Sequence, residues 1–582
     1  MIDRDELLTK ARSGGEGGDV IDVDVAIVGA GVSGLYTGYR LLTGSYEQGA
    51  RPSKVCVFEV ANRPGGRLDS VMLPGLTIWG ELGGMRYMDP NHAIVTALIA
   101  KVFSKELTPK GFPMGDPATH FFYLRKQRFR ANGWENAQGQ KPPQRFMTRY
   151  DLNADDVGFS ADQLFNKVVH DVLMADPTIK AEYGKKILNP KPYTYDFKLT
   201  ARDWDAIKPV LRYCFDGPYS GELVNDLGFW NVLKDQTSEE GYDFLADAGG
   251  YYSNTINWNA AEAFPYMVGD FTTAKFNYFT LEDGYDGIAF ALLKHYLAQS
   301  GSALSLESRL IRFDRAPKGQ RRRYELTVRD EKTGKDTRAY ADALVLAMPR
   351  RSLELLDQDS FAFQANGGKL AQTIPTTIVE PSLKILMGFD EPWWRTDFGA
   401  TAGESITDLP IRQCYYFGTD AADSHSLFLG GYTDMTPVRF WEALDRGDLF
   451  VPRPTRLVSA ADLEPLLSAQ APNAMVTEAM EQVRELHGRP DIPDPFVTRV
   501  RDWTEDPFGG GYHAWQPGIS VKDVMEFMRQ PVPGEPIHIC GEAYSDQQGW
   551  VEGALCVAER MLQDHFGLGW PTWLDSNYYL GW

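Results

Sequence analysis

The segment covering residues 24–34 constrains the fold more than any other feature of this 582-residue chain. Its apolar start, residues 25–28, is typical of a β-strand, and the glycines behind that run have the G-x-G-x-x-G spacing of a dinucleotide-binding turn. A helical stretch over residues 35–42 follows. The first glycine permits a tight turn, the second lets the backbone approach a pyrophosphate, and the third lets helix and strand pack closely. Because a helix start offers free N–H groups to an anion, the segment predicts a phosphate site. Its residues are Gly29, Gly31, Val32, Ser33 and Gly34.

A second apolar run, residues 54–60, ends near Glu59, which lies 25 residues beyond Gly34. An acid at this position accepts hydrogen bonds from both ribose hydroxyls and repels a 2′-phosphate. We therefore expect an adenosine that is not phosphorylated at this position, bound by Glu59 and the neighbouring Val60.

The next motif, Arg63-Pro-Gly-Gly-Arg67-Leu, begins four residues after Glu59. Gly65 and Gly66 supply backbone N–H groups, and Arg67 supplies a guanidinium for a second approach to the phosphates. Together with the glycine-rich turn, this motif resembles the flavin amine oxidase superfamily, which implies that the dinucleotide is FAD.

Residues 79–87, Trp-Gly-Glu-Leu-Gly-Gly-Met-Arg-Tyr, resemble the substrate-side strand of the L-amino acid oxidase branch of that superfamily. In that branch the arginine at the position of Arg86 binds the α-carboxylate of the substrate. The resemblance also implies that Gly83, Gly84, Met85 and Arg86 lie beside the cofactor. The alternative for Arg86 is an ordinary surface or ion-paired arginine.

The chain returns to the cofactor near its end, where an apolar run over residues 537–540 leads into Gly541-Glu542. The resemblance implies that Gly541 and Glu542 contact the ribityl chain. It also places Gly549, Trp550 and Val551 at the flavin ring, where a helix N-terminus stabilises negative charge on the N1/C2=O edge. Leu310, on a predicted hairpin strand, completes the expected cofactor contacts. Glu552, in the first turn of this helix, either contributes to the flavin site or only caps the helix.

Two motifs resemble the walls of the reaction chamber. Lys384, eight residues before Pro392, is similar to the family lysine that holds a water near flavin N5. The segment Asp506-Pro-Phe-Gly-Gly-Gly-Tyr512 makes Tyr512 one aromatic wall and Trp550 the other. Monoamine oxidases carry a flavin-bonded cysteine where this chain has Gly511, so we expect noncovalent FAD. We expect the neighbouring His513 at the pocket rim and not as a base.

The resemblance assigns two more substrate contacts. Gly549 is expected to offer its carbonyl to the substrate amine, and Tyr432 to join Arg86 on the carboxylate. Aligning Tyr432 needs a one-residue gap, and a core or surface aromatic is the alternative.

The implied reaction is oxidation of L-amino acids, with hydride transfer from Cα to flavin N5 and dioxygen as acceptor. The products are a 2-oxo acid, ammonium and hydrogen peroxide. We expect a broad substrate range that favours larger apolar or aromatic side chains. The alternatives are an amine or polyamine oxidase, a flavin 2-monooxygenase that forms an amide, a flavin desaturase, and a non-enzymatic flavin-fold scaffold.

The predicted fold is α/β, with a discontinuous Rossmann-like FAD domain, a mixed-sheet substrate domain and a helical insertion. We expect residues 20–70, 275–350 and 497–567 in the FAD domain. Residues 71–150, 250–274 and 351–496 are expected in the substrate domain, and residues 151–249 in the helical domain.

Local patterns predict several elements within this plan. Ser160 and Gln163 form a capping box ahead of a helix, and helices are also expected at residues 222–233, 287–297 and 472–487. A hairpin is expected at residues 308–313 and 324–328, and further strands at residues 271–281 and 341–347. Residues 1–19 are expected to form a loose arm, and the aromatic tail from residue 568 to pack on the FAD domain or on another subunit.

The net charge of −20, from 79 acidic and 59 basic side chains, disfavours nucleic acid or an anionic membrane as partner. The longest charge-free apolar runs fall far short of the ~20 residues that span a bilayer. Charged residues stand where a secretory signal has its apolar core, so we expect a cytoplasmic protein. Separately, we expect the protein to assemble as a homodimer. No His/Cys cluster has metal-ligand spacing, and the five cysteines are expected to be buried thiols.

Overall fold

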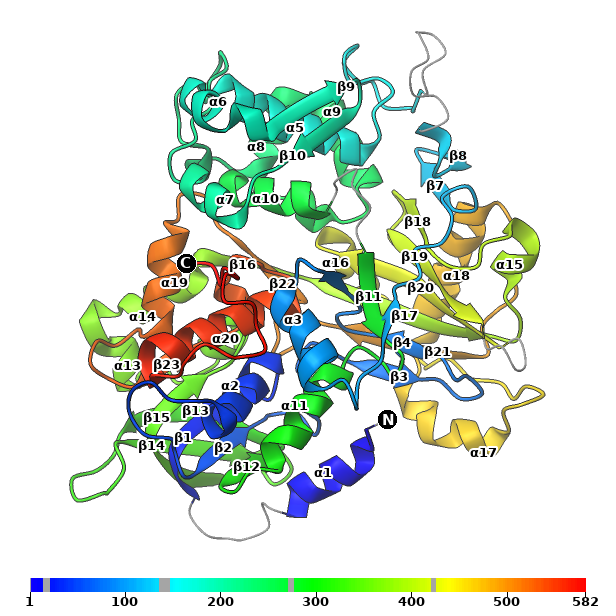
Figure 1. The fold of residues 1–582 in the computed structure, drawn as a ribbon. Helices are drawn as coiled ribbons and strands as arrows, with labels where there is room; N and C mark the ends of the chain where they lie inside the picture. The colour runs from blue at the N-terminus through cyan, green and yellow to red at the C-terminus, as the bar shows by residue number, and fades with distance from the viewer. Residues whose placement is uncertain (1, 14–20, 135–146, 271–276, 420–424) are drawn as a thin grey trace.

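The structure, a computed structural model, describes residues 2–13, 21–134, 147–270, 277–419 and 425–582. Figure 1 shows three regions: a sheet with flanking helices at the lower left, a second sheet at the right, and a group of helices at the top. The predicted α/β fold class, with its mixed sheet and helical insertion, is confirmed.

The first region is built on the sheet that follows the glycine-rich turn, here called the glycine-loop sheet. Its strand order is β12-β2-β1-β15-β14-β13, and β23 also pairs with β15. Five strands run parallel to one another, and β13 and β14 form the predicted antiparallel hairpin. The strands are β1 (Ile21–Val28), β2 (Val55–Phe58), β12 (Ser302–Ser305), β13 (Ser308–Arg315), β14 (Tyr324–Asp330), β15 (Asp336–Leu346) and β23 (Ile537–Ile539).

Helices α2 (Val32–Thr43), α11 (Gly287–Leu297) and α20 (Val551–Phe566) pack beside this sheet and share its hydrophobic core. Val28 pairs with Leu346 in parallel register, so the turn after β1 lies against Ala347 at the end of β15. The strands come from segments far apart in the chain, and the carboxyl ends of the parallel strands gather at one edge. That edge is where α/β sheets bind ligands.

The second sheet, here called the substrate-side sheet, has the order β21-β17-β20-β19-β18-β7-β8 and is mixed, because only the β18–β7 pair is parallel. Its register places Lys384 of β17 opposite Tyr432 of β20. The described residues also form three small sheets that accompany the two large ones, β3-β4, β5-β11-β6 and β16-β22. The strands of the large sheet are β7 (Phe121–Leu124), β8 (Gln127–Arg130), β17 (Ser382–Phe389), β18 (Glu404–Thr407), β19 (Gln413–Thr419), β20 (Ser426–Asp434) and β21 (Val497–Asp502). The small sheets consist of β3 (Ser70–Met72), β4 (Trp79–Glu81), β5 (Tyr87–Asp89), β6 (Pro109–Gly111), β11 (Asn277–Leu281), β16 (Thr377–Glu380) and β22 (Tyr512–Trp515).

The helical insertion forms the group at the top of Figure 1 and has its own hydrophobic core. Besides helices it contains one hairpin, β9-β10, and its core runs on to Val268. The elements are α5 (Ala161–Ala175), α6 (Pro177–Tyr183), β9 (Ile187–Lys191), β10 (Thr194–Phe197), α7 (Ala201–Ile207), α8 (Phe229–Gln236), α9 (Glu239–Ala248) and α10 (Ala260–Asp270).

Several local predictions are confirmed. The Ser160/Gln163 capping box is formed in both directions, and α18 (Asn473–His487) ends at Gly488 in the left-handed conformation. Strand β11 begins at Asn277, and the earlier part of its predicted strand, residues 271–276, lies outside the described residues.

Three predictions are wrong. Residues 222–233 do not form one helix, because Gly228 is extended and the N–H of Phe229 donates to the Trp258 carbonyl. Within the predicted loose arm, α1 (Arg4–Ser13) is helical, and Arg4 pairs with Asp286 at 2.6 Å and stacks on Trp79, while residues 1 and 14–19 of the arm lie outside the described residues. Cys214 is exposed, whereas the other four cysteines are buried.

The aromatic tail packs on the glycine-loop core of its own chain. Leu568, Leu574 and Leu580 are buried in the same cluster as β1 and α2. The hydroxyl of Tyr578 donates to Glu552 on α20 at 2.7 Å. Of the two alternatives for the tail, the structure therefore shows packing on the glycine-loop domain.

Candidate functional site

The three glycines of the turn have separate steric reasons. Gly29 has φ +106°, and a Cβ there would lie 2.4 Å from the Ala347 carbonyl oxygen. A Cβ on Gly34 would lie 1.9 Å from the carbonyl oxygen of Gly29, so the helix could not pack at this distance. A Cβ on Gly31 would meet no described atom within 4 Å, because this residue faces open space. The first and third glycines thus permit packing, and the second leaves room for a ligand.

Helix α2 presents its N-terminus to that space without a competing acid. Its N-cap is Gly31, no side chain caps it, and its first turn contains no Asp or Glu. Gly65 forms an isolated bridge with Gly31, which brings the second glycine motif against the first. Free N–H donors at a helix start, with glycine backbone opposite, are suited to a pyrophosphate.

Glu59 lies directly after β2 and is 5 % exposed. Its two carboxylate oxygens accept from the backbone N–H groups of Ala30 at 2.7 Å and Ala61 at 2.9 Å. Burial raises the pKa of Glu59, and those N–H groups oppose the rise. The carboxylate is therefore held at a fixed place in the cavity wall, where its remaining lone pairs can accept from hydroxyl groups.

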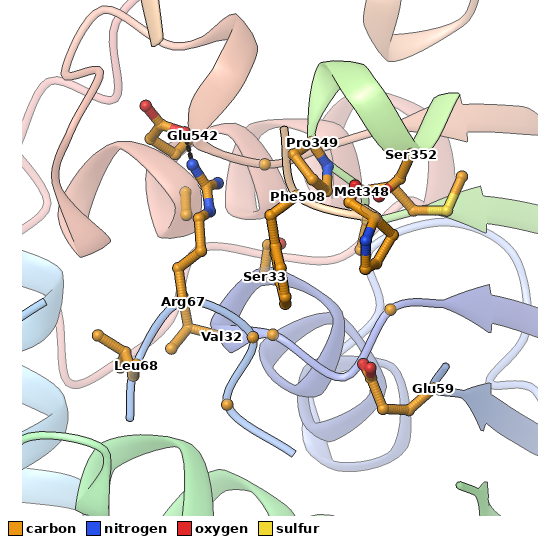
Figure 2. A pocket seen from close by; sticks show the side chains of 18 of the residues that line it. Val32, Ser33, Glu59, Arg67, Leu68, Met348, Pro349, Ser352, Phe508 and Glu542 are labelled. Atoms are coloured by element: carbon orange, nitrogen blue, oxygen red, sulfur yellow. Dashed lines mark hydrogen bonds and ion pairs between the residues drawn. The ribbon is translucent and has the colours of Figure 1, made fainter. Parts of the chain in front are cut away.

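One long cavity joins these parts and encloses about 1260 Å³ of space free of protein atoms, part of it open to solvent. Figure 2 shows Glu59 near one end of the cavity and the Arg67–Glu542 ion pair near the other. Most of the predicted cofactor residues line it: Gly29, Gly31, Val32, Ser33, Glu59, Val60, Gly65, Gly66, Arg67, Gly84, Leu310, Gly541, Glu542, Gly549, Trp550 and Val551. Four predicted cofactor residues are not in this lining: Gly34 is used for packing, and Gly83, Met85 and Arg86 line a second, adjoining cavity instead.

The sequence interpretation missed part of this lining. Met348, Pro349, Ser352 and Phe508 belong to it (Figure 2). Met348 and Pro349 follow β15, a parallel neighbour of β1, so the position of these two residues at the carboxyl end of a predicted buried strand was a usable signal.

Glu542 organises the second end of the cavity. Its carboxylate pairs with Arg67 at 2.8 Å and accepts from the backbone N–H groups of His513 at 3.0 Å and Gly549 at 2.8 Å. Burial raises its pKa, but Arg67 and His513 outweigh that effect and hold the pKa of Glu542 at about 2. The guanidinium of Arg67, expected at the phosphates, is therefore directed at Glu542, and it also donates to the Gly511 carbonyl at 3.0 Å.

His513 and Glu552 lie behind the cavities and do not line them. The rim position expected for His513 is wrong, since its side chain is fully buried and its Nδ1 lies 2.9 Å from Glu542. Glu552 caps a different helix, α3 (Ala93–Ala97), by accepting from the N–H groups of Ile94 and Val95 at 2.8 and 2.9 Å. Glu552 therefore caps α3 and not its own helix α20, which neither of the two roles considered for it described.

A second cavity of about 620 Å³ adjoins the first, and we call it the chamber. Both cavities are lined by Gly84, Tyr512, Gly549, Trp550 and Val551. The chamber also receives Arg86, Lys384 and Tyr432, together with Gly83 and Met85, so the structure brings all the predicted substrate contacts into one space.

Arg86 is half-buried at the chamber wall. Its guanidinium lies 4.2 Å from the centre of the Tyr278 ring and 5.4 Å from that of Phe112, and it contacts the Met114 sulfur at 3.5 Å. Aromatic faces of this kind hold a guanidinium without neutralising its charge. The arrangement supplies a cation at the chamber that can bind a carboxylate by two parallel hydrogen bonds.

Lys384 is buried, and its Nζ donates to the Gly83 carbonyl at 2.6 Å and lies 4.5 Å from the Tyr432 ring centre. Burial lowers the pKa of Lys384, the charge of Glu81 opposes this, and Arg86 lowers it further. Burial likewise raises the pKa of Glu81. The Lys384 amine therefore loses its proton at a pH closer to the physiological range than an exposed lysine does.

Three chamber residues were not found from the sequence: Tyr251, Tyr266 and Tyr285. Tyr285 lies in the Gly284-Tyr-Asp-Gly287 segment that predicted a helix start, so a turn motif gave a partial signal for it. Tyr251 and Tyr266 come from the end of the helical insertion and from α10, whose sequences carry no recognisable motif. With Tyr432, Tyr512 and Trp550 they make the chamber predominantly aromatic.

The comparisons with known proteins agree with this geometry. A family model for flavin-containing amine oxidoreductases matches residues 32–451 and 453–560. Aplysianin-A of Aplysia kurodai is 26 % identical over 94 % of this chain and 90 % of its own length. The L-amino-acid oxidase of Mus musculus is 24 % identical over 94 % of this chain and 71 % of its own length. The solved structure of wild-type putrescine oxidase bound to putrescine matches with a TM-score of 0.60 at 16 % identity, covering 94 % of this chain and 99 % of that one.

Among the described residues, no group of three or more His, Cys, Asp or Glu side chains could hold a metal ion. Within the same residues, no helix is both long and apolar enough to cross a membrane.

Proposed function

Because the chain belongs to the family of flavin-containing amine oxidoreductases, we propose that it is an FAD-dependent oxidase of L-amino acids. FAD is the cofactor of this family, and the long cavity fits it: open glycine backbone and a bare helix start suit the pyrophosphate, and Glu59 suits a ribose. When bound there, FAD would supply the two-electron acceptor for oxidation of the substrate at its Cα–H bond. The overall products are a 2-oxo acid, ammonium and hydrogen peroxide, formed with dioxygen and water.

One observation carries the choice of an amino acid over a simple amine: Arg86 is a cation in the wall of the chamber. A carboxylate there gains two charged hydrogen bonds, whereas an amine without a carboxylate gains nothing from this residue. Tyr432 lines the same chamber and can add a hydroxyl donor. We assign Arg86 and Tyr432 to the substrate carboxylate.

The remaining chamber residues orient the substrate. Gly549 has φ +82° and lines both cavities, so its carbonyl can accept from a neutral substrate amine where the cavities meet. Tyr512 and Trp550 flank this position and hold the Cα between them. When the carboxylate and the amine are both held, the Cα–H bond can point in only one direction. This orientation of the reacting bond is the main contribution that a protein makes to such a reaction. We assign Lys384 to holding a water or a proton at its Nζ.

The chamber lining contains six aromatic residues and no Asp or Glu, which supports a broad range of larger apolar or aromatic side chains. Oxidation confined to arginine, lysine or glutamate would contradict this range without contradicting the reaction.

The test compares L-phenylalanine with phenethylamine, which lacks only the carboxylate. We would measure anaerobic bleaching of the flavin in the parent, in Arg86→Ala and in Arg86→Lys. Arg86→Ala should cost about 3 to 5 kcal/mol of L-phenylalanine stabilisation, because a carboxylate is left unpaired in a partly desolvated chamber. Arg86→Lys should also fail, since an ammonium cannot reproduce the planar fork.

Arg130→Ala is the matched control. Arg130 is also half-buried and stacks on an aromatic ring, Phe121, at 4.0 Å, but it lines neither cavity. Its removal should leave bleaching by L-phenylalanine unchanged. Fast reduction of the parent by phenethylamine would instead identify an amine oxidase, and undiminished reduction of Arg86→Ala by L-phenylalanine would show that Arg86 does not bind the substrate carboxylate.

A further inference from the structure

Asp434 is a buried acid next to the chamber that the mechanism above does not use. It is the last residue of β20, two residues beyond Tyr432, and it is 1 % exposed. It lines neither cavity. A buried carboxylate is costly unless it is fully hydrogen-bonded, so its partners indicate what it holds in place.

Those partners are two segments that supply chamber walls. One oxygen accepts from the backbone N–H of Tyr252 at 3.0 Å, and the other accepts from the backbone N–H and the hydroxyl of Ser253 at 2.9 and 2.6 Å. The hydroxyl of Tyr512 lies 2.5 Å from the Ser253 hydroxyl and 3.3 Å from the carboxylate. One side chain therefore connects strand β20, the end of the helical insertion and strand β22.

Each connected segment carries a tyrosine of the chamber. Tyr432 is on β20, Tyr251 precedes the two amides that donate to Asp434, and Tyr512 starts β22. The rings of Tyr251 and Tyr432 meet edge to face with centres 5.2 Å apart. Tyr512 lies against Gly549, since a Cβ on Gly549 would be 3.6 Å from its ring.

A buried arginine contacts the Tyr252 ring in addition to the contacts that Asp434 makes with the backbone of this segment. The guanidinium of Arg412, which is fully buried, lies 3.7 Å from the centre of the Tyr252 ring. Burial raises the pKa of Asp434, while the hydrogen bonds from Ser253 and the charge of Arg412 oppose that rise. The segment is thus clamped between a buried cation and a buried acid.

We propose that Asp434 is a positioning residue for substrate, which acts through Ser253 and Tyr512 to set the three tyrosines as one wall of the chamber. This inference rests on the proposed function, because that function makes the chamber the substrate site. Asp434 touches neither substrate nor cofactor in this assignment.

The test uses the flavoprotein with Asp434→Asn, Ser253→Ala, Tyr512→Phe and the double variants that combine Asp434→Asn with each of the other two. The asparagine retains one acceptor oxygen but turns an NH₂ group toward N–H donors. We expect kcat/KM for L-phenylalanine to fall roughly 10- to 100-fold in Asp434→Asn, with unchanged flavin content. Ser253→Ala is the milder variant should Asp434→Asn not fold, and it should show a loss in the same direction.

Two measurements separate positioning from a general loss of stability. If Asp434 acts through the two hydroxyls, its substitution should cost much less in the Ser253→Ala and Tyr512→Phe backgrounds than in the parent, whereas an indirect structural effect gives additive losses. Amide hydrogen exchange should also accelerate at Tyr252 and Ser253. Asp156→Asn is the control: Asp156 is a buried acid of the helical insertion that pairs with Lys167 and lines neither cavity, so its substitution should change neither measurement.

A third measurement separates this inference from the proposed function. Benzoate combines an aromatic ring with a carboxylate, and its binding is read from the absorbance of bound FAD without turnover. If the parent oxidises no amino acid but Asp434→Asn still weakens benzoate binding about 10-fold, the positioning role holds and the proposed function does not. Additive losses, or unchanged benzoate affinity and exchange in Asp434→Asn, would overturn the inference.

Discussion

The backbone N–H of Gly549 donates to the carboxylate of Glu542 at 2.8 Å, and this contact links the cofactor cavity to the chamber. Gly549 lines both cavities, so an acid that faces the cofactor fixes the backbone assigned to the substrate amine. Under the proposed function, we therefore expect cofactor binding and substrate orientation to depend on one carboxylate.

Substitution of Glu542 tests this link. Glu542→Gln removes the charge that pairs with Arg67 and leaves one acceptor oxygen for several donors, so FAD affinity should fall by about 1.5 to 3 kcal/mol. The measurement is FAD binding to the apoprotein. Glu552→Gln is the matched control, because Glu552 also accepts backbone N–H groups in the core but lines neither cavity. If both variants lose FAD equally, the effect is one of stability.

FAD should be released intact when the protein is denatured. The reason is that Gly511 stands where monoamine oxidases carry the flavin-bonded cysteine, and glycine has no side chain that could form this bond. A cysteine at this position would also require the Ser382 side chain to move, since a Cβ on residue 511 would lie 1.9 Å from the Ser382 hydroxyl. We expect all yellow colour in the supernatant after acid precipitation. Gly511→Cys should lose thermal stability and gain no covalent flavin, and colour that remains on the parent polypeptide would contradict this.

Glu59→Ala should weaken FAD binding by about 1.5 to 3 kcal/mol, because a charged acceptor for the ribose hydroxyls is lost. Reconstitution of the apoprotein with FAD measures the change. Glu391→Ala, an exposed glutamate at the end of the substrate-side sheet, should bind FAD like the parent. Undiminished FAD affinity in Glu59→Ala would show that the ribose lies elsewhere.

The buried His92 should make the protein sensitive to acid. Its ring packs against Trp550 with centres 4.8 Å apart, its Nδ1 accepts from the Met88 N–H at 3.1 Å, and burial lowers its pKa to about 3 from 6.5. Because the unfolded chain binds this proton and the folded chain does not, stability falls as pH drops from about 6.5 toward 3.

His92→Asn keeps an acceptor for Met88 but cannot titrate in this range. The variant should be less stable than the parent at pH 7, since it loses the ring contact with Trp550. The difference between the two proteins in free energy of unfolding should narrow by about 2 to 4 kcal/mol toward pH 3. Melting temperatures of both proteins across this range provide the comparison. A gap that stays constant with pH would show that His92 does not contribute to acid sensitivity.

Much of the cofactor cavity was predictable from the sequence because its chemistry is local. Gly29, Gly31 and Gly34 act through their own backbone, and an acid such as Glu59 follows a strand at a regular distance. The wrong helix and arm predictions arose because local patterns carry no information about contacts with distant residues. Residues 222–233 read as one helix because nothing nearby shows that the N–H of Phe229 bonds to Trp258, and the helical arm depends on Arg4 reaching Asp286.

The sequence by itself determined the residues that work through backbone conformation or short spacing, which are the glycine-rich turn and the acid after β2. The motifs that contain Arg86 and Lys384 were identified through their resemblance to a known family. Only the tertiary structure decided which distant residues share a wall. Asp434 and Ser253 are 181 positions apart, and Glu552 caps a helix 458 positions away. Such contacts depend on how separate sheets and helices pack, and since that packing has no period along the chain, no local pattern records it.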